Sequence, residues 1–218
     1  MGARPVPAPL ADAARRAGRL GLLGGSFDPP HLGHLHAARR AREAFALEHV
    51  VFVPAARPPH KPERVLAGET QRLEMLALLL SEEPDASVWG VELARRGPSY
   101  TIETLRELRA LVPATTALFL ILGEDNLAGF AGWRAAEEIV ALAQPIVVHR
   151  SGVEPATARA ELSPFARTRL ALGTLATPAL DASSTAVRAS LARGQEASAL
   201  VPPRLLEYIR AHGLYLGP

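Results

Sequence analysis

The sequence predicts an α/β fold in which helices flank a doubly wound parallel sheet within a single domain. Short apolar runs alternate with helical patterns through most of the 218 residues, and the connections between them are short. The run Ala117–Leu122 (ALFLIL) is apolar throughout, as in a central strand buried on both faces. No repeat or low-complexity linker divides residues 19–216, so one domain explains the pattern better than two.

The individual elements follow from the same patterns. We expect strands at Leu20–Leu23, His49–Pro54, Ala86–Glu92, Ala117–Leu122, Pro145–His149 and Arg169–Leu175. We expect helices at Leu32–Phe45, Glu69–Leu80, Thr101–Leu111, Trp133–Leu142, Ser184–Ala192 and Pro203–His212. Inward-facing positions are predicted at Leu35, Ala38 and Phe45 of the first helix and at Leu73, Leu76, Ala77 and Leu80 of the second. Residues 1–18, rich in proline, alanine and arginine, are expected to form a mobile tail before a domain of residues 19–218.

The composition excludes several classes of protein. Cysteine is absent, which excludes a disulfide scaffold, a cysteine nucleophile and a thiolate metal site and fits a cytoplasmic protein. The net charge of +2 and the lack of a basic run with interleaved aromatic residues argue against a nucleic-acid partner. No apolar run approaches the roughly 18 residues of a membrane span, so no membrane partner is expected. The sequence leaves open whether the protein is a monomer or a homodimer.

The stretch GGSFDPPHLGH, Gly24 to His34, follows the first predicted strand directly. Gly24 and Gly25 allow a ligand to approach the backbone closely, and two prolines then stiffen the turn. The next helix begins near His31, where unpaired N–H groups and the helix dipole favour an anion. His31 and His34 are three residues apart and so lie on one side of the first turn. These features together predict a phosphate clamp.

The stretch admits other interpretations. It can be a structural turn with incidental histidines. A metal site is disfavoured because His36, the third imidazole, points elsewhere and no carboxylate has convincing ligand spacing, so no metal ligand is assigned. The dinucleotide-binding pattern G-x-G-x-x-G and the P-loop pattern with its lysine are both absent.

The same stretch resembles the G-G-x-F-x-P-x-H-x-G-H motif of the nucleotidylyltransferase superfamily. ASSTAVR, Ala182 to Arg188, is similar to its second motif, I-S-S-T-x-I-R. Four more segments resemble the bacterial nicotinate-nucleotide adenylyltransferases, and with them the likeness extends over residues 19–216: PPHK (58–61), SYTIETL (99–105), LGEDNLAGFAGW (122–133) and VPPRLLEYIRAHGLY (201–215). The resemblance implies a Rossmann-like fold.

The resemblance also implies a reaction, in which nicotinic acid mononucleotide attacks the α-phosphorus of ATP and pyrophosphate leaves. No protein base is needed, because the attacking phosphate is already largely ionised near pH 7. His34, His31 and Arg188 would be catalytic, and Mg²⁺ would come with the ATP. The implied ATP-binding residues are Gly24, Gly25, Ser26, Phe27, His31, His34, Ser183, Ser184, Thr185 and Arg188. From the residues alone, the serines at 183 and 184 are explained equally well as a helix N-cap.

The mononucleotide would be held by a second group of residues. Trp133 would stack on the pyridine ring, and Tyr100 and Thr101 at a helix start would receive its carboxylate. Asp125 would bind a ribose hydroxyl and Lys61 the phosphate. Each has a plain alternative: a core tryptophan, a helix cap, a solvated loop charge and an exposed basic turn.

Two rival functions remain. Another transferase of the superfamily would act on nicotinamide mononucleotide or, less well supported by these segments, on phosphopantetheine. A non-catalytic nucleotide-binding regulator would be expected to lack His34 or Arg188, and both are present.

Overall fold

The computed structural model describes residues 8–57, 67–127, 129–150, 161–177 and 182–216. Its strands are β1 (Arg19–Gly25), β2 (His49–Pro54), β3 (Ala86–Val88), β4 (Ala117–Gly123), β5 (Gln144–Arg150) and β6 (Thr174–Thr177). Its helices are α1 (Asp12–Arg16), α2 (Leu32–Ala44), α3 (Glu69–Leu79), α4 (Val91–Ala94), α5 (Thr101–Leu111), α6 (Glu124–Leu127), the 3₁₀ turn η1 (Phe130–Gly132), α7 (Ala136–Leu142), α8 (Pro164–Leu172), α9 (Ser184–Ala192) and α10 (Pro203–Ala211). No helix within these ranges is long and apolar enough to cross a membrane.

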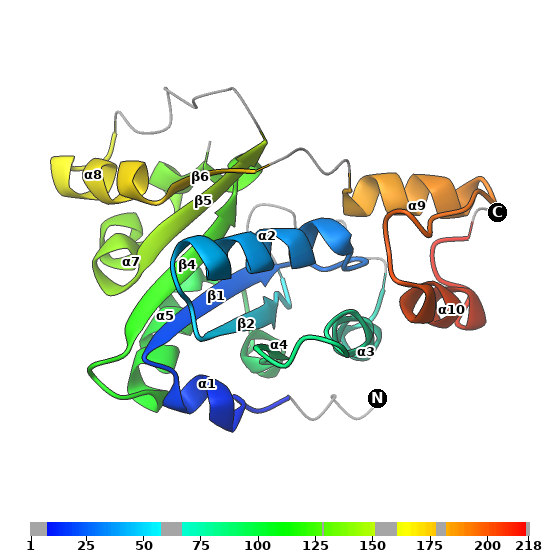
Figure 1. Cartoon of the computed structure of the whole chain (residues 1–218), viewed down its shortest axis with the longest axis horizontal. Helices are drawn as coiled ribbons and strands as arrows, with labels where there is room; N and C mark the ends of the chain where they lie inside the picture. The colour runs from blue at the N-terminus through cyan, green and yellow to red at the C-terminus, as the bar shows by residue number, and fades with distance from the viewer. Residues whose placement is uncertain (1–7, 58–66, 128, 151–160, 178–181, 217–218) are drawn as a thin grey trace.

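The six strands form one parallel sheet in the order β3-β2-β1-β4-β5-β6, which is the doubly wound order of the Rossmann fold. β1 lies between β2 and β4, so the chain changes direction across the sheet beside β1 (Figure 1). Ligands bind such sheets at the carboxyl ends of the strands next to this switch point. The predicted fold class is therefore confirmed, and Gly24 stands at the expected place.

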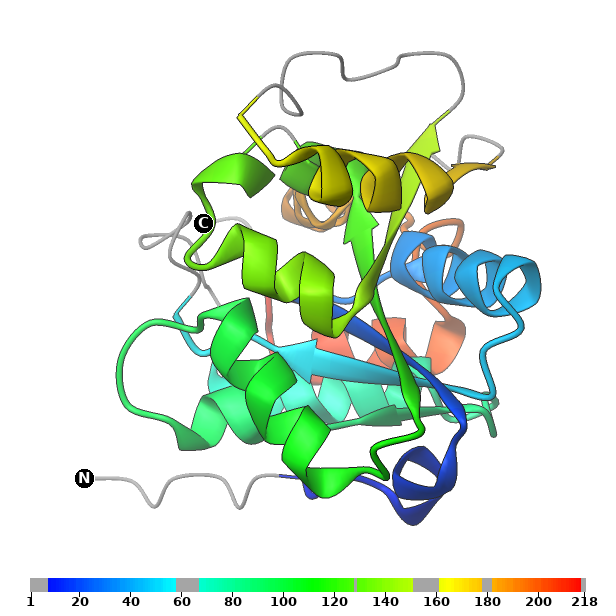
Figure 2. The ribbon, with the colours of Figure 1, turned by 90° about the vertical axis from the view of Figure 1, so that its left-hand side faces the viewer.

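Two helical layers cover the sheet and bury separate hydrophobic clusters. Apolar side chains of α2, α3, α9 and α10 pack on one face. Figure 1 shows α2 in front of the strands on this face. Apolar side chains of α1, α4, α5, α6, α7 and α8 pack on the other, where Figure 2 shows α5, α7 and α8 in front of the strands. The two motifs, Gly24 to His34 and Ala182 to Arg188, therefore belong to the same helical layer, because the first leads into α2 and the second into α9.

Residues 8–18 differ from the predicted mobile tail. They contain α1, and the side chains of Leu10, Ala14 and Ala17 are buried in the core. The carbonyl of Ala17 also accepts a hydrogen bond of 2.9 Å from the Thr116 hydroxyl. The alanine and leucine residues of this segment recur at helical spacing and cover the end of the sheet at which β1 begins. The proline content of the segment obscured this amphipathic pattern.

Two predicted strands are wrong in extent or type. The strand expected at Ala86–Glu92 ends at Val88, because Val91–Ala94 turn into α4. The strand expected at Arg169–Leu175 is mostly the end of α8, and β6 begins only at Thr174. Gly173 ends the helix, and its α-carbon lies against the backbone of Pro145, where no larger residue fits.

Two predicted helices differ in detail. The helix expected from Trp133 begins at Ala136, because Ala135 has a left-handed backbone with φ of 56°. In α3, Leu73 is only partly buried and Ala77 is exposed. Leu76 and Leu80 are buried as predicted. The buried face also contains Arg72, Met75 and Leu79, which were not predicted.

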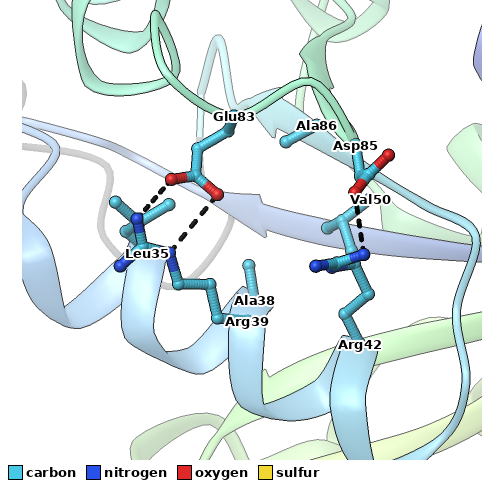
Figure 3. Close-up of a pocket in the computed structure, with 8 residues that line it drawn as sticks. All are labelled: Leu35, Ala38, Arg39, Arg42, Val50, Glu83, Asp85 and Ala86. Carbon is cyan, nitrogen blue, oxygen red and sulfur yellow. Dashed lines mark hydrogen bonds and ion pairs between the residues drawn. The ribbon is translucent and has the colours of Figure 1, made fainter.

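One shallow groove lies between α2 and the turn that precedes β3 (Figure 3). Two ion pairs span it, Arg39 with Glu83 and Arg42 with Asp85, the latter at 2.8 Å. The groove touches β2 and β3 at Val50 and Ala86, near their amino ends. It therefore lies at the opposite end of the sheet from Gly24, and its charges are already paired.

Candidate active site

The turn after β1 places two imidazoles at the carboxyl end of the sheet. Phe27 has a left-handed backbone, with φ of 50°, and its ring is buried against Phe52 and His34. Gly24 is exposed at the strand end, and a Cβ there would meet no atom within 4 Å from the part of the chain that the structure describes. Phe27 can therefore contact a ligand only through its backbone, whereas Gly24 leaves open space for one.

His31 and His34 cap α2 reciprocally. Nδ1 of His31 accepts a hydrogen bond of 3.1 Å from the N–H of Gly33, and Nδ1 of His34 accepts one of 3.2 Å from the N–H of His31. An Nδ1 atom that accepts a hydrogen bond carries no proton, so each neutral ring has its proton on Nε2. The two ring centroids are 3.8 Å apart. The pair thus combines two Nε2–H donors at one helix start.

This capping corrects one part of the sequence-based interpretation. The prediction relied on unpaired backbone N–H groups at the start of α2. The structure pairs these groups: those of His31 and Gly33 donate to the imidazoles, and that of Leu32 donates to the carbonyl of Leu200 at 2.9 Å. An anion here would meet imidazole donors rather than amides.

Burial and the neighbouring His31 hold the pKa of His34 well below its ordinary value of 6.5. His34 is therefore neutral at pH 7 and a hydrogen-bond donor through Nε2. The unfolded chain takes up a proton on this residue near pH 6.5, whereas the folded chain resists it. Stability from this source is complete above pH 6.5 and is lost as the pH falls.

We expect the free energy of unfolding of the nucleotide-free protein to fall between pH 7 and pH 5.5, with His34 contributing at most about 1.4 kcal/mol per pH unit. Urea unfolding at several pH values measures this slope. The His34→Asn variant should show a shallower slope, because asparagine does not titrate. Burial also lowers the pKa of His49. The slope of the His49→Asn variant is therefore measured for comparison. An unchanged slope in His34→Asn would contradict the assignment.

The second motif lies directly against the first. The Ser184 hydroxyl donates to the carbonyl of Pro29 at 2.9 Å, although 155 residues separate the two in sequence. Arg188 donates from Nη1 to the carbonyl of Asp28 at 2.6 Å and from Nη2 to the Thr185 hydroxyl at 3.2 Å. Ser183 is an N-cap, because its hydroxyl accepts the N–H of Ala186 at 3.0 Å. The two bonds from Arg188 use two of the five N–H groups of its guanidinium and leave the Thr185 hydroxyl proton unused.

Gly33 makes this close approach of α2 to the second motif possible. A Cβ at Gly33 would lie 2.9 Å from the carbonyl oxygen of Ala182 and 2.9 Å from Nδ1 of His31. Any larger residue would therefore push apart the two motifs or disturb the histidine pair. Gly33 is therefore required for packing at the contact between the two motifs, which we call the joint.

The residues predicted for the second substrate lie on the other helical layer. Tyr100 is the residue before α5 and Thr101 is its first residue. Trp133 is partly buried, with its ring 5.3 Å from that of Phe130. The guanidinium of Arg134 lies 4.7 Å from the ring centre of Tyr100, which joins the tryptophan segment to the start of α5.

The remaining predicted residues are placed less fully. Asp125 lies in α6, directly after β4, at the same end of the sheet as Gly24, and its side chain is not described. Lys61 lies outside the described residues. Sequence reasoning missed Arg134, which ion-pairs with Glu103 at 3.2 Å beside Tyr100. An arginine directly after the motif tryptophan was the available signal.

A buried arginine was also missed. Arg72 of α3 is 1% exposed, and its Nη1 donates to the carbonyls of Ser26 at 2.8 Å and Ala55 at 2.7 Å. It therefore ties the turn after β1 to the end of β2. Burial lowers the pKa of Arg72, and Asp28 opposes this shift. Ser26, predicted to bind ATP, uses its carbonyl for this contact.

Several known proteins are similar to this chain. The family model described as cytidylyltransferase-like matches residues 22–190. The "Probable nicotinate-nucleotide adenylyltransferase" of Thermus thermophilus is 41% identical over 197 residues, which cover 90% of this chain and 99% of that protein. The protein of the same name from Dehalococcoides mccartyi is 36% identical over 197 residues, covering 90% and 97%. The solved structure of Plasmodium falciparum nicotinic acid mononucleotide adenylyltransferase complexed with APC has the same fold, with a TM-score of 0.70, 16% identity and coverage of 90% and 96%.

Proposed function

Because the chain belongs to the nicotinate-nucleotide adenylyltransferase family, within the cytidylyltransferase-like proteins, we propose that it transfers AMP from MgATP to nicotinic acid mononucleotide. The products are nicotinic acid adenine dinucleotide, a precursor of NAD, and pyrophosphate. The observation that carries the proposal is the His31–His34 pair, held at the end of β1 and joined to the helix of Arg188.

The reaction is a direct displacement. A phosphate oxygen of the mononucleotide forms a bond to the α-phosphorus, and the bond from that phosphorus to the bridging oxygen breaks, so that both electrons leave with pyrophosphate. Catalysis then consists of alignment and of stabilising charge on the phosphoryl oxygens. The Nε2–H groups of His34 and His31 would donate to these oxygens. Arg188, partly buried beside them, would donate to the phosphates through its guanidinium.

Mg²⁺ enters this proposal as part of the substrate. Among the described residues no group of three or more His, Cys, Asp or Glu side chains is arranged to hold a metal ion. The triphosphate and water would therefore provide its ligands. Gly24, Gly25 and Thr185 would contact the triphosphate.

The mononucleotide would bind beyond β4, opposite the histidines. Trp133 would stack on the pyridine ring, Asp125 would bind a ribose hydroxyl, and Lys61 the phosphate. The start of α5 at Tyr100 and Thr101, together with Arg134, favours a carboxylate over an uncharged amide.

The experiment is a measurement of pyrophosphate release from MgATP with either the acid or the amide mononucleotide. We expect release with both to be enzyme-dependent and kcat/KM to be higher for the acid. No release with either nucleotide would refute the adenylyl transfer. Higher kcat/KM for the amide would refute only the acid preference.

A further inference from the structure

Asp28, in the centre of the first motif, is held by residues outside both motifs. Its side chain is 2% exposed. Oδ1 accepts a hydrogen bond of 3.0 Å from the N–H of Ala67 and one of 2.6 Å from the hydroxyl of Tyr215. A buried carboxylate that loses such a donor is strongly disfavoured, so these contacts fix where Asp28 lies.

Tyr215 reaches Asp28 through an unusual backbone path. After α10, Gly213 and Tyr215 both have left-handed backbones, each with φ of 60°. Glycine adopts this conformation readily, but a tyrosine does so at a cost that surrounding contacts must offset. Burial and the Asp28 carboxylate raise the pKa of Tyr215, so its hydroxyl keeps its proton and donates at all physiological pH values. The segment after α10 is therefore held at Tyr215 by the hydrogen bond from its hydroxyl to the carboxylate of Asp28.

Asp28 links this contact to the groups assigned to ATP. Its backbone carbonyl accepts the hydrogen bond from Nη1 of Arg188, so the carboxylate side is held by Tyr215 and the carbonyl side by Arg188. The residue before it, Phe27, packs its ring on His34 with 4.9 Å between centroids. Asp28 is therefore hydrogen-bonded directly to Arg188 and adjoins the residue that packs on His34.

We propose that Tyr215 is a positioning residue for adenylyl transfer, whose hydroxyl sets Asp28 and through it the arrangement of His34 and Arg188 around the ATP phosphates. The proposal rests on the proposed function for the identity of the ligand. Tyr215 itself would touch Asp28 and not the reacting atoms.

The test compares Tyr215→Phe with Tyr208→Phe. Tyr208 of α10 is a matched control, because its hydroxyl also donates to a carboxylate, that of Glu74 in α3. This bond involves no residue of the turn after β1. We expect Tyr215→Phe to weaken ATP binding, measured by calorimetry, about tenfold, as for the loss of one hydrogen bond to a charged group. The kcat/KM for ATP should fall by a similar factor while KM for the mononucleotide stays within about twofold. Tyr208→Phe should change neither.

A double-mutant cycle with Asp28→Asn checks the route of the effect. Tyr215→Phe should add little to Asp28→Asn if the tyrosine acts through that carboxylate. Wild-type ATP binding by Tyr215→Phe would overturn the proposal, as would equal effects of Tyr215→Phe and Tyr208→Phe. If Asp28→Asn does not fold, the comparison of the two tyrosine variants decides alone. Calorimetry separates the two proposals, because failure of pyrophosphate release in the wild type refutes the reaction, whereas the binding difference tests Tyr215.

Discussion

Replacing His34 by alanine is expected to lower kcat for pyrophosphate release by about 10²–10³-fold, the usual cost of one donor to a developing charge. The same change should lower the free energy of unfolding by only about 1 kcal/mol, because it removes one cap of α2. This disproportion is what distinguishes a group that acts on the substrate from one that supports the helix. Steady-state kinetics and urea unfolding of the same preparation measure the two quantities.

His36→Ala is the matched control for this experiment. His36 is on the same helix two residues further on, so it points away from the side on which His31 and His34 lie. The control should keep kcat within a few-fold of the wild type. Equal proportional losses of activity and stability in His34→Ala, or an equal loss of activity in His36→Ala, would be incompatible with the role given to His34.

The second large effect is expected from Gly24→Ala. The added methyl group would meet no atom of the described residues within 4 Å, and the backbone of Gly24 is not in the left-handed region. The folded protein should therefore be as stable as the wild type or slightly more stable. If the triphosphate lies in this open space, the methyl group meets the ligand instead. Overpacking of about 1–3 kcal/mol corresponds to a rise of roughly 5- to 150-fold in the KM for ATP.

Gly68→Ala provides the comparison, since among the described residues the methyl group there would meet only the flexible Gln71 side chain, at 3.5 Å. It should leave the KM for ATP unchanged. Kinetics at saturating mononucleotide, together with thermal unfolding of each variant, give the measurement. A wild-type KM for ATP in Gly24→Ala would refute the placement of the triphosphate at the end of β1.

The central strands and the first motif could be predicted because their signals are local. Runs such as Ala117–Leu122 are apolar on both faces, as is typical of a strand buried in a parallel sheet. The face of α3 could not be predicted in the same way. Arg72 is buried because two backbone carbonyls, from segments distant in sequence, accept its protons. A prediction based on the spacing of apolar residues places an arginine such as Arg72 on the solvent-exposed face of the helix.

The errors near α8 have a similar origin. The helix begins with the cap of Ser163 and with Pro164, upstream of the stretch that suggested a strand. Leucine and alanine suit a helix as well as a buried strand when no partner is known.

The site also has features that local sequence signals predict and features that they do not. The two motifs indicated which residues meet, and the contact of Ser184 with Pro29 confirms that the segments lie together. The use of the helix N–H groups by the imidazoles depends on side-chain rotamers, which no spacing rule contains. The roles of Lys61, Asp125 and Trp133 remain predictions.

The joint between the two motifs also determines when during synthesis the protein can acquire a site. A ribosome makes β1 and the histidine pair first, but Ser184 and Arg188, which hold that turn, are added more than 150 residues later. Until then the turn lacks the contacts to Pro29 and the carbonyl of Asp28, and α2 lacks the Leu200 carbonyl that receives its Leu32 N–H. Nascent chains that stop before α9 should therefore contain all six strands of the sheet but no complete nucleotide site.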